Sequence, residues 1–258
     1  WKLLQLEPSA LREPYNFTAP VQLASNGAHL PAMLFHLANR PSEDGLDGAA
    51  IYTEVANRLA QLLDDAGSVH VDRDERRQLL TLYATGRDGA QHPARALSDG
   101  TLRFLALTVL AIDPEARGVI CMEEPENGLH PERIPAMIQL LSDLATNIKE
   151  AVSADSGNPL RQVIVNTHSP SVVMQVPEES LILAEPVEVS LGGRPSRTVQ
   201  FRCLPGTWRA KAGSPGGVSK GRLLAYLNPV AHQGRGGRRV VDREDIRQYR
   251  IPVAAAGD

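Results

Sequence analysis

The segment Val119–Pro131 constrains the fold more than any other part of this sequence. It reads VICMEEPENGLHP, so four apolar residues run directly into two adjacent carboxylates, Glu123 and Glu124. A short apolar run of this kind is typical of a strand that is buried on both faces of a parallel sheet. Open α/β sheets bind their ligands at the carboxyl ends of such strands. The sequence therefore predicts a parallel α/β sheet that delivers two acids to a crevice at its edge.

The periodicity of the remaining chain favours the same α/β class. We expect amphipathic or buried helices at Ala49–Leu63, Ser98–Leu110 and Pro131–Ile148. Buried strands are expected at Val119–Met122 and Gln162–Asn166, and further strands at 181–184, 187–189 and 199–201. The alternation of helices with buried strands is typical of βαβ units. Short strand patterns at Val69–Val71 and Leu79–Tyr83, next to the first helix, predict a small strand-and-helix insertion.

Two acids at the end of one strand suggest two different roles. Glu123 lies where a carboxylate would hold Mg²⁺, directly or through a water molecule. Glu124 lies where a carboxylate would orient and activate a water molecule against a γ-phosphate. For an isolated acid pair, the alternative is a strand that simply ends in solvated carboxylates, so the interpretation depends on other segments.

Two other segments carry matching polar groups. Upstream, Leu97-Ser98-Asp99-Gly100-Thr101 opens an apolar helix whose free amides can receive an anion, although an ordinary N-cap has the same appearance. Downstream, the apolar run Val163–Val165 leads to His168 at the carboxyl end of a second buried strand. A lone histidine in this position is also typical of a structural loop residue.

The order of these three elements resembles the second half of an ABC-type nucleotide-binding domain. In that half, a signature motif, a Walker B strand with a catalytic glutamate, a D-loop and a switch histidine follow one another. The segments LSDGTLR, EEPENGLHP and THSP are similar to the motifs of stand-alone AAA-family ATPases related to RecF, SMC and OLD proteins, rather than to those of membrane transporters. The resemblance covers residues 95–185.

For the signature motif, the resemblance implies contact with the γ-phosphate of an ATP molecule that a partner protomer holds. Ser98 and Gly100 would make this contact, and Asp99 and Thr101 belong to the same nucleotide-binding motif. The catalytic site would therefore be shared within a homodimer.

For the strand ends, the resemblance implies the remaining roles. Glu123 replaces the usual Walker B aspartate as the Mg²⁺ ligand, and Glu124 would be the catalytic base. Asn127 lies in the D-loop, in which His130 stands where an aspartate is usual. His168 would sense or polarise the γ-phosphate. ATP and Mg²⁺ are therefore the expected cofactors.

No segment of the chain matches the phosphate-binding loop G-x-x-x-x-G-K-[ST]. The glycine cluster Gly213–Gly221 around Lys220 has neither the spacing nor a preceding strand. We therefore expect an ABC-type P-loop NTPase fold that lacks its amino-terminal Walker A lobe. Such a chain would not hold ATP tightly by itself and would be inactive until that lobe completes the site.

The sequence divides into three expected regions. Residues 1–94 would form a helical and short-strand region before the signature, residues 95–204 the carboxy-terminal part of the ATPase domain, and residues 205–258 a flexible basic tail. Basic residues of that tail, among them Lys220, Arg235, Arg238 and Arg239, would either meet the phosphates of DNA or form a solvated face.

Composition excludes several classes of protein. A net charge of −3 argues against wholesale coating of nucleic acid. No apolar run of 18 or more residues occurs and the first residues lack the order of a secretory signal, so a cytoplasmic protein without a membrane anchor is expected. Cys121 and Cys203 lack the paired spacing of a metal site and are expected to be reduced.

The leading functional hypothesis is a dimeric ATP-hydrolysing switch or motor that acts in DNA maintenance or phage defence beside a separate effector. No clustered glutamate and Asp-x-Asp pattern follows Leu183, so a nuclease domain within this chain is not expected. A nuclease is therefore a candidate for the separate effector. The alternative is a non-hydrolysing interaction or DNA-binding module whose acids are only structural.

Overall fold

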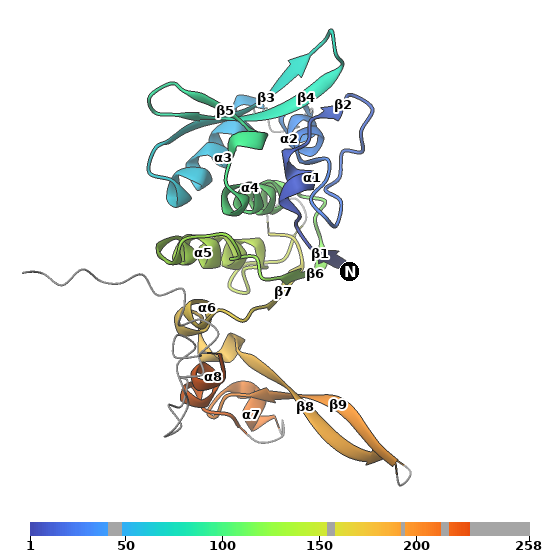
Figure 1. Cartoon of the computed structure of the whole chain (residues 1–258), viewed down its shortest axis with the longest axis vertical. Helices are drawn as coiled ribbons and strands as arrows, with labels where there is room; N and C mark the ends of the chain where they lie inside the picture. Colours follow the sequence, from blue (N-terminus) through green and yellow to red (C-terminus); the bar gives the residue numbers. More distant parts are fainter. Residues whose placement is uncertain (41–47, 154–157, 192–193, 213–216, 228–258) are drawn as a thin grey trace, which may run out of the picture.

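The computed structural model describes residues 1–40, 48–153, 158–191, 194–212 and 217–227. These residues form three parts that follow one another along the long axis of the molecule (Figure 1). An antiparallel sheet with helices lies at one end, a parallel sheet with helices lies in the middle, and a β-hairpin with short helices lies at the other end. The parallel sheet carries the candidate site.

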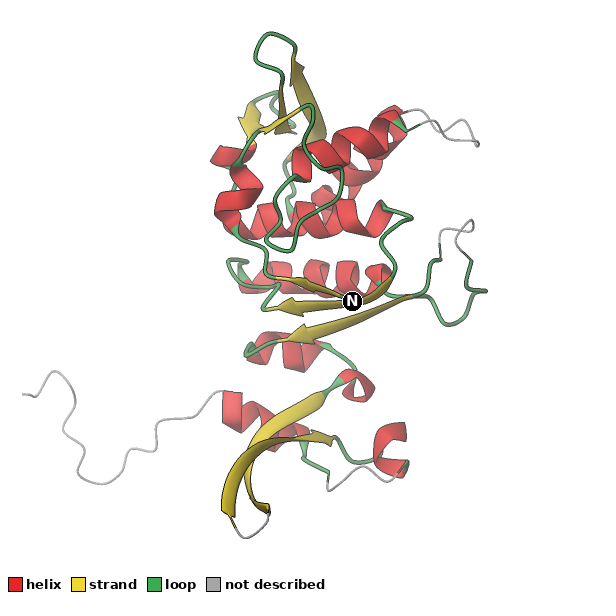
Figure 2. Cartoon of the chain, turned by 90° about the vertical axis from the view of Figure 1, so that its right-hand side faces the viewer, coloured by secondary structure: helices red, strands yellow, loops and turns green. Residues whose placement is uncertain are grey.

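The central sheet consists of three parallel strands, β1 (Lys2–Leu4), β6 (Gly118–Glu123) and β7 (Arg161–Asn166). Their order is β1-β6-β7, and Figure 2 shows them side by side with the same direction. The register aligns Leu4 with Met122 and Glu123 with Asn166. The predicted parallel sheet and its two predicted strands are confirmed, whereas β1 was not expected because three residues are too few to display a pattern.

Helix α4 (Asp99–Ile112) is the centre of the main hydrophobic core. It packs against α3 (Gly48–Leu62), α5 (Ile134–Leu144) and α1 (Pro8–Arg12). Phe104 and the leucines around it are completely buried, which explains why the predicted helix has no polar face. The Ser98 side chain accepts the N–H of Thr101 and so forms the N-cap.

The predicted helix Pro131–Ile148 is shorter than expected. It begins as a 3₁₀ turn, η2 (Pro131–Arg133), and its α-helical part α5 ends at Leu144. The chain leaves the helix there because the Thr146 hydroxyl donates to the carbonyl oxygens of Pro159 and Arg161, both at 2.9 Å. These bonds draw the segment after α5 to the start of β7.

The predicted strand-and-helix insertion is an antiparallel sheet with helices on one face. Its strands are β2 (Tyr15–Asn16), β3 (Ala66–Asp74), β4 (Leu79–Gly86) and β5 (Gln91–Pro93), in the order β2-β4-β3 with β5 on the edge of β4. Alternate β4 residues, such as Leu80 and Leu82, enter the main core, and α2 (Leu30–Asn39) packs against this strand. A 3₁₀ turn, η1 (Ala94–Ala96), connects this sheet to α4.

The third part contains a long hairpin, β8 (Ile182–Leu191) and β9 (Arg194–Cys203). The strands expected at 181–184 and 187–189 are thus one strand. Around its base lie α6 (Pro170–Gln175), η3 (Glu178–Ser180), α7 (Trp208–Lys211) and α8 (Lys220–Leu227). Val173, Leu183 and Leu223 belong to the small second core there.

The segment 205–258, expected as a flexible basic tail, therefore begins inside this second core, where Val218 and Leu223 are buried. Residues 228–258, with Arg235, Arg238 and Arg239, lie outside the described residues. Cys121 and Cys203 are free thiols. Within the described part of the chain, no helix combines the length and apolarity needed to cross a bilayer.

Candidate functional site

The ends of β6 and β7 bring the predicted acids and the predicted histidine to one edge of the sheet. The backbone N–H of Glu124 donates to the carbonyl oxygen of Asn166 at 2.8 Å, so the segments that follow the two strands start side by side. Glu123 is exposed, Glu124 is half-buried and His168 is exposed. The two adjacent acids and the distant His168 therefore lie at the carboxyl-terminal end of the sheet, where open α/β sheets bind ligands.

Glu124 has an unusual backbone conformation. Its φ of 43° lies in the left-handed region, which residues with a Cβ rarely adopt. The chain reverses directly after it, with the Asn127 N–H donating to the Glu124 carbonyl oxygen at 3.0 Å. Strained residues of this kind cluster at functional sites, where the surrounding structure holds them in place. The conformation therefore distinguishes Glu124 from an ordinary solvated acid at a strand end.

Gln5 is a functional candidate that the sequence interpretation missed. It follows β1 directly, and its Nε2 donates to Oε2 of Glu123 at 3.1 Å. The signal in the sequence was weak, because only the short apolar run Leu3-Leu4 precedes this glutamine. Only the pairing of β1 with β6 reveals that the amide faces the acid.

The predicted signature residues lie at the amino terminus of α4. The Ser98 and Thr101 hydroxyls are 2.7 Å apart, and Thr101 is buried whereas Ser98 is exposed. Asp99 is exposed and forms an ion pair of 2.5 Å with Arg12, whose Nη2 also donates to the Leu97 carbonyl oxygen at 3.1 Å. Ser98 thus has the ordinary N-cap geometry that the sequence left as an alternative.

Gly100 allows helix α4 to touch the loop 127–130. A Cβ at this position would lie 2.5 Å from Cδ2 of Leu129 and 2.7 Å from the carbonyl oxygen of Gly128. Gly128 itself has a φ of 84°, which glycine adopts without strain. The two glycines therefore permit a backbone contact between α4 and the loop that carries Asn127.

Alanine at Gly100 is expected to destabilise the protein by about 2 kcal/mol, because the new Cβ would meet a backbone atom, the carbonyl oxygen of Gly128, and not only the end of a flexible side chain. Helix propensity alone would give the opposite sign, a gain of about 1 kcal/mol. Urea unfolding measures the change. Gly221→Ala in α8, where the new Cβ meets nothing within 4 Å, is the matched control and is expected to be neutral or stabilising. If both variants were as stable as the parent protein, the close contact between Gly100 and Gly128 would be contradicted.

Arg103 is a second residue that the sequence interpretation missed. Its Nε donates to the Leu6 carbonyl oxygen at 3.1 Å, and its Nη1 donates to the Asn127 carbonyl oxygen. The guanidinium thus joins helix α4 to the segment after β1 and to the loop 127–130. An arginine inside an otherwise apolar helix was the available signal.

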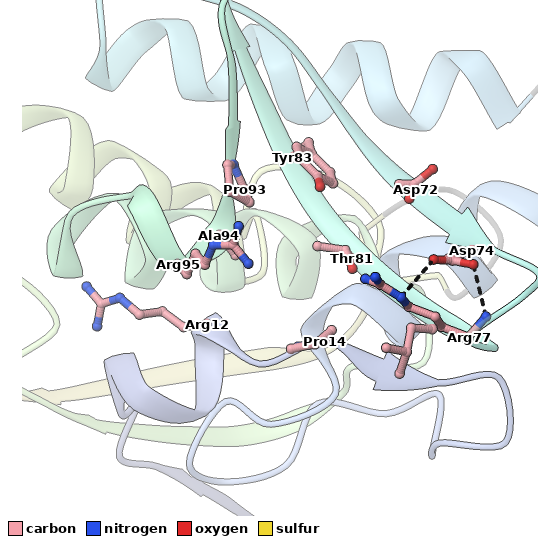
Figure 3. A pocket seen from close by; sticks show the side chains of 11 residues that line it. Arg12, Pro14, Asp72, Asp74, Arg77, Thr81, Tyr83, Pro93, Ala94 and Arg95 are labelled. Atoms are coloured by element: carbon pink, nitrogen blue, oxygen red, sulfur yellow. Dashed lines mark hydrogen bonds and ion pairs between the residues drawn. The ribbon is translucent and has the colours of Figure 1, made fainter.

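A separate cavity of about 270 Å³ lies on the outer face of the antiparallel sheet (Figure 3). Tyr83 and Asp72 line it from the sheet, and Arg95 and Arg12 line it from η1 and α1. Asp74 and Arg77 interact at its rim, as the dashed lines in Figure 3 indicate. The cavity contains none of the predicted site residues and carries both signs of charge.

Comparison with known proteins gives one family and two similar structures. Residues 21–174 match the family described as "AAA domain, putative AbiEii toxin, Type IV TA system". A solved Smc head domain with a coiled coil and joint from Pyrococcus yayanosii is 12% identical over 70% of this chain and 29% of that chain, with a TM-score of 0.41. This chain thus spans less than a third of that protein's length.

A second solved structure comes from work on ATP-driven dimerization and DNA stimulated activation of SMC ATPases. It is 14% identical over 58% of this chain and 83% of that chain, with a TM-score of 0.36. No curated protein matches the sequence.

Proposed function

Since the chain belongs to the AAA domain family matched by residues 21–174, we propose that it supplies the carboxy-terminal half of an ATP site in a dimeric, ATP-driven switch. The observation that carries this proposal is the strained turn at Glu124, which is hydrogen-bonded to the end of β7 just before His168. In the proposed reaction, Glu124 orients the attacking water molecule and His168 polarises the γ-phosphate. Hydrolysis then releases the closed dimer.

Glu123 is the proposed Mg²⁺ ligand. Magnesium in nucleotide sites commonly takes one or two carboxylates and fills its remaining positions with phosphate oxygens and water. A single exposed carboxylate with the Gln5 amide beside it fits that requirement. In the described residues, no group of three His, Cys, Asp or Glu residues forms a fuller metal cage, which suits a metal held mainly by its nucleotide. The ion would neutralise charge that develops on the transferred phosphate.

The signature residues are proposed to reach the ATP molecule of the partner protomer. Ser98, Asp99, Gly100 and Thr101 lie at the positive end of the α4 dipole, where backbone N–H groups favour an anion. Asp99 alone would repel a triphosphate. Its ion pair with Arg12 supports the assignment, because the guanidinium offsets this charge before the nucleotide arrives. Asn127 would contribute from the D-loop beside them.

The phosphate-binding loop is proposed to come from a lobe outside these 258 residues, so that this chain alone does not hydrolyse ATP. β7 is one of the two edge strands of the parallel sheet as far as the described residues show, and Ile164 on it is 46% exposed. A further parallel strand added at this edge would bring such a loop beside His168. Free strand edges accept added strands through their unpaired backbone groups.

A cellular role in defence is the finer part of the proposal. The family description names a toxin of a type IV toxin–antitoxin system, which fits a chain that acts beside a separate partner protein. A nuclease effector and DNA are the proposed partners.

The alternative function is a non-hydrolysing interaction or DNA-binding module. Its support is that Ser98, Asp99 and Gly100 each already have a structural contact, namely the N-cap, the ion pair with Arg12 and the packing on Gly128. The acids and His168 would then be surface residues, and nucleotide would have no effect on the oligomeric state.

The deciding experiment uses the complete protein, that is, this chain together with the proposed phosphate-binding lobe. Phosphate release and the molar mass from light scattering are measured with ATP, in the presence and in the absence of Mg²⁺. We expect turnover that EDTA abolishes, and a monomer-to-dimer shift that requires ATP. The same measurements on the 258-residue chain alone should give no turnover. Turnover that is absent in both, together with a mass that ATP does not change, would favour the interaction module.

A further inference from the structure

Glu126 is a buried acid that directly precedes residues 127–130, the expected D-loop. Only 8% of its surface is exposed, although the neighbouring residue Asn127 is exposed. A carboxylate loses much hydration free energy when it is buried, so such groups are normally satisfied by several donors. Here Oε1 accepts one hydrogen bond, and Oε2 has no partner among the described residues. The turn itself does not require the acid, because Leu129 bonds to the backbone carbonyl of Glu126 at 3.1 Å.

The single donor to Glu126 is the hydroxyl of Thr167, the residue immediately before His168. The Thr167 Oγ1 atom in turn accepts the backbone N–H of Ser169 at 3.0 Å. The hydroxyl therefore clamps the backbone on both sides of His168, and the carboxylate fixes the hydroxyl. No other side-chain bond between the D-loop and this loop occurs in the described part of the chain.

The other side of the D-loop is tied to the signature helix. Arg103 donates to the carbonyl oxygen of Asn127, which directly follows Glu126, and Gly100 packs against Gly128. A displacement of α4 by a partner's nucleotide would thus reach Glu126 through the short turn that the Leu129 N–H bond to Glu126 closes. From Glu126 it would pass through one hydrogen bond to the loop of His168.

We propose that Glu126 is a positioning residue that sets the loop carrying His168 relative to the D-loop, by accepting the Thr167 hydroxyl. This role rests on the proposed function. It specifies the contact through which the signature motif and His168 would move together when nucleotide binds. The carboxylate acts as a hydrogen-bond acceptor, so a glutamine side chain, which keeps an acceptor oxygen, replaces it.

The first test needs no nucleotide. Backbone amide exchange is measured in the 258-residue chain for the parent, Thr167→Val and Thr167→Ser. Valine has nearly the shape of threonine but removes the hydroxyl, so the Ser169 amide is expected to exchange about ten-fold faster, the factor that corresponds to a hydrogen bond of about 1.4 kcal/mol. Serine is expected to restore the parent rate. An unchanged Ser169 rate in Thr167→Val would overturn the proposal.

The matched pair at the other end of the bond is Glu126→Ala and Glu126→Gln. Alanine is expected to reproduce the faster exchange of Ser169, and glutamine to remain within about three-fold of the parent. Amide rates in β4, remote from the loop, serve as the internal control for global unfolding. Glutamine that behaves like alanine would overturn the acceptor role.

The second test uses ATP turnover of the complete protein. Thr167→Val and Glu126→Ala are expected to lower kcat about ten-fold with KM for ATP within two-fold, whereas Thr167→Ser and Glu126→Gln retain kcat. The double variant Glu126→Ala with Thr167→Val should lose no more than either single variant, because both remove the same bond. Additive losses would overturn the proposal. Absence of turnover in the parent would refute the proposed function alone, since the exchange test stands without it.

Discussion

Replacement of Glu124 by glutamine is expected to reduce ATP turnover of the complete protein by at least about 100-fold, while ATP-driven dimerisation persists. Glutamine keeps the size of the side chain but cannot take a proton from the attacking water molecule, and loss of a positioned general base typically costs 10²-fold to 10⁴-fold. The strained φ of 43° is a property of the backbone turn, so the isosteric change leaves it in place. Phosphate release and light scattering on the same sample measure the two effects.

The matched control is Glu132→Gln in η2. Glu132 belongs to the same acidic segment, but its side chain is 85% exposed and lies beside His130. Turnover of this variant should remain within two-fold of the parent. Normal turnover of Glu124→Gln would remove the catalytic assignment, and loss of the dimer in that variant would instead indicate a structural role for the acid.

Replacement of Arg161 by methionine is expected to destabilise the protein by about 3 kcal/mol, the largest effect on stability that we predict. Arg161 is 6% exposed, and burial lowers the pKa of its guanidinium group. The group donates to the carbonyl oxygens of Ala111, at 2.9 Å, and of Asp113 and Ala116. Methionine preserves the apolar stem but removes the charged donor that these three carbonyl oxygens share, although the Asp113 oxygen keeps the Ala116 N–H at 3.2 Å. A bond to a charged group contributes about 1.5–3 kcal/mol.

Arg117→Met is the control for this prediction. Arg117 lies in the same connection between α4 and β6 and donates to the Pro114 carbonyl oxygen at 3.1 Å, but it is exposed. Its loss should change the free energy of unfolding by less than about 0.5 kcal/mol. Urea denaturation separates the two outcomes. Equal, small effects would mean that Arg161 does not hold the α4–β6 connection to β7.

The elements that the sequence predicted well are those whose signal is local. The apolar run that ends in acids is strand β6, the segment with amphipathic periodicity is helix α3, and the serine before the apolar helix is the N-cap of α4. Each depends on spacing within a few residues, which the chain carries in any fold. The helix end at Leu144 and the hairpin β8–β9 were less well predicted, because contacts with β7 and cross-strand pairing determine them.

The sequence by itself determined which residues carry the candidate chemistry: Glu123, Glu124 and His168 follow buried strands, and parallel strands deliver their ends to one edge. Only the tertiary structure decided how these residues are held. Gln5 faces Glu123 because β1 pairs with β6, and Thr167 reaches Glu126 because β7 ends beside the turn that follows β6. These contacts join residues more than 40 positions apart, and a polar side chain in a sequence carries no mark of the partner that folding will give it.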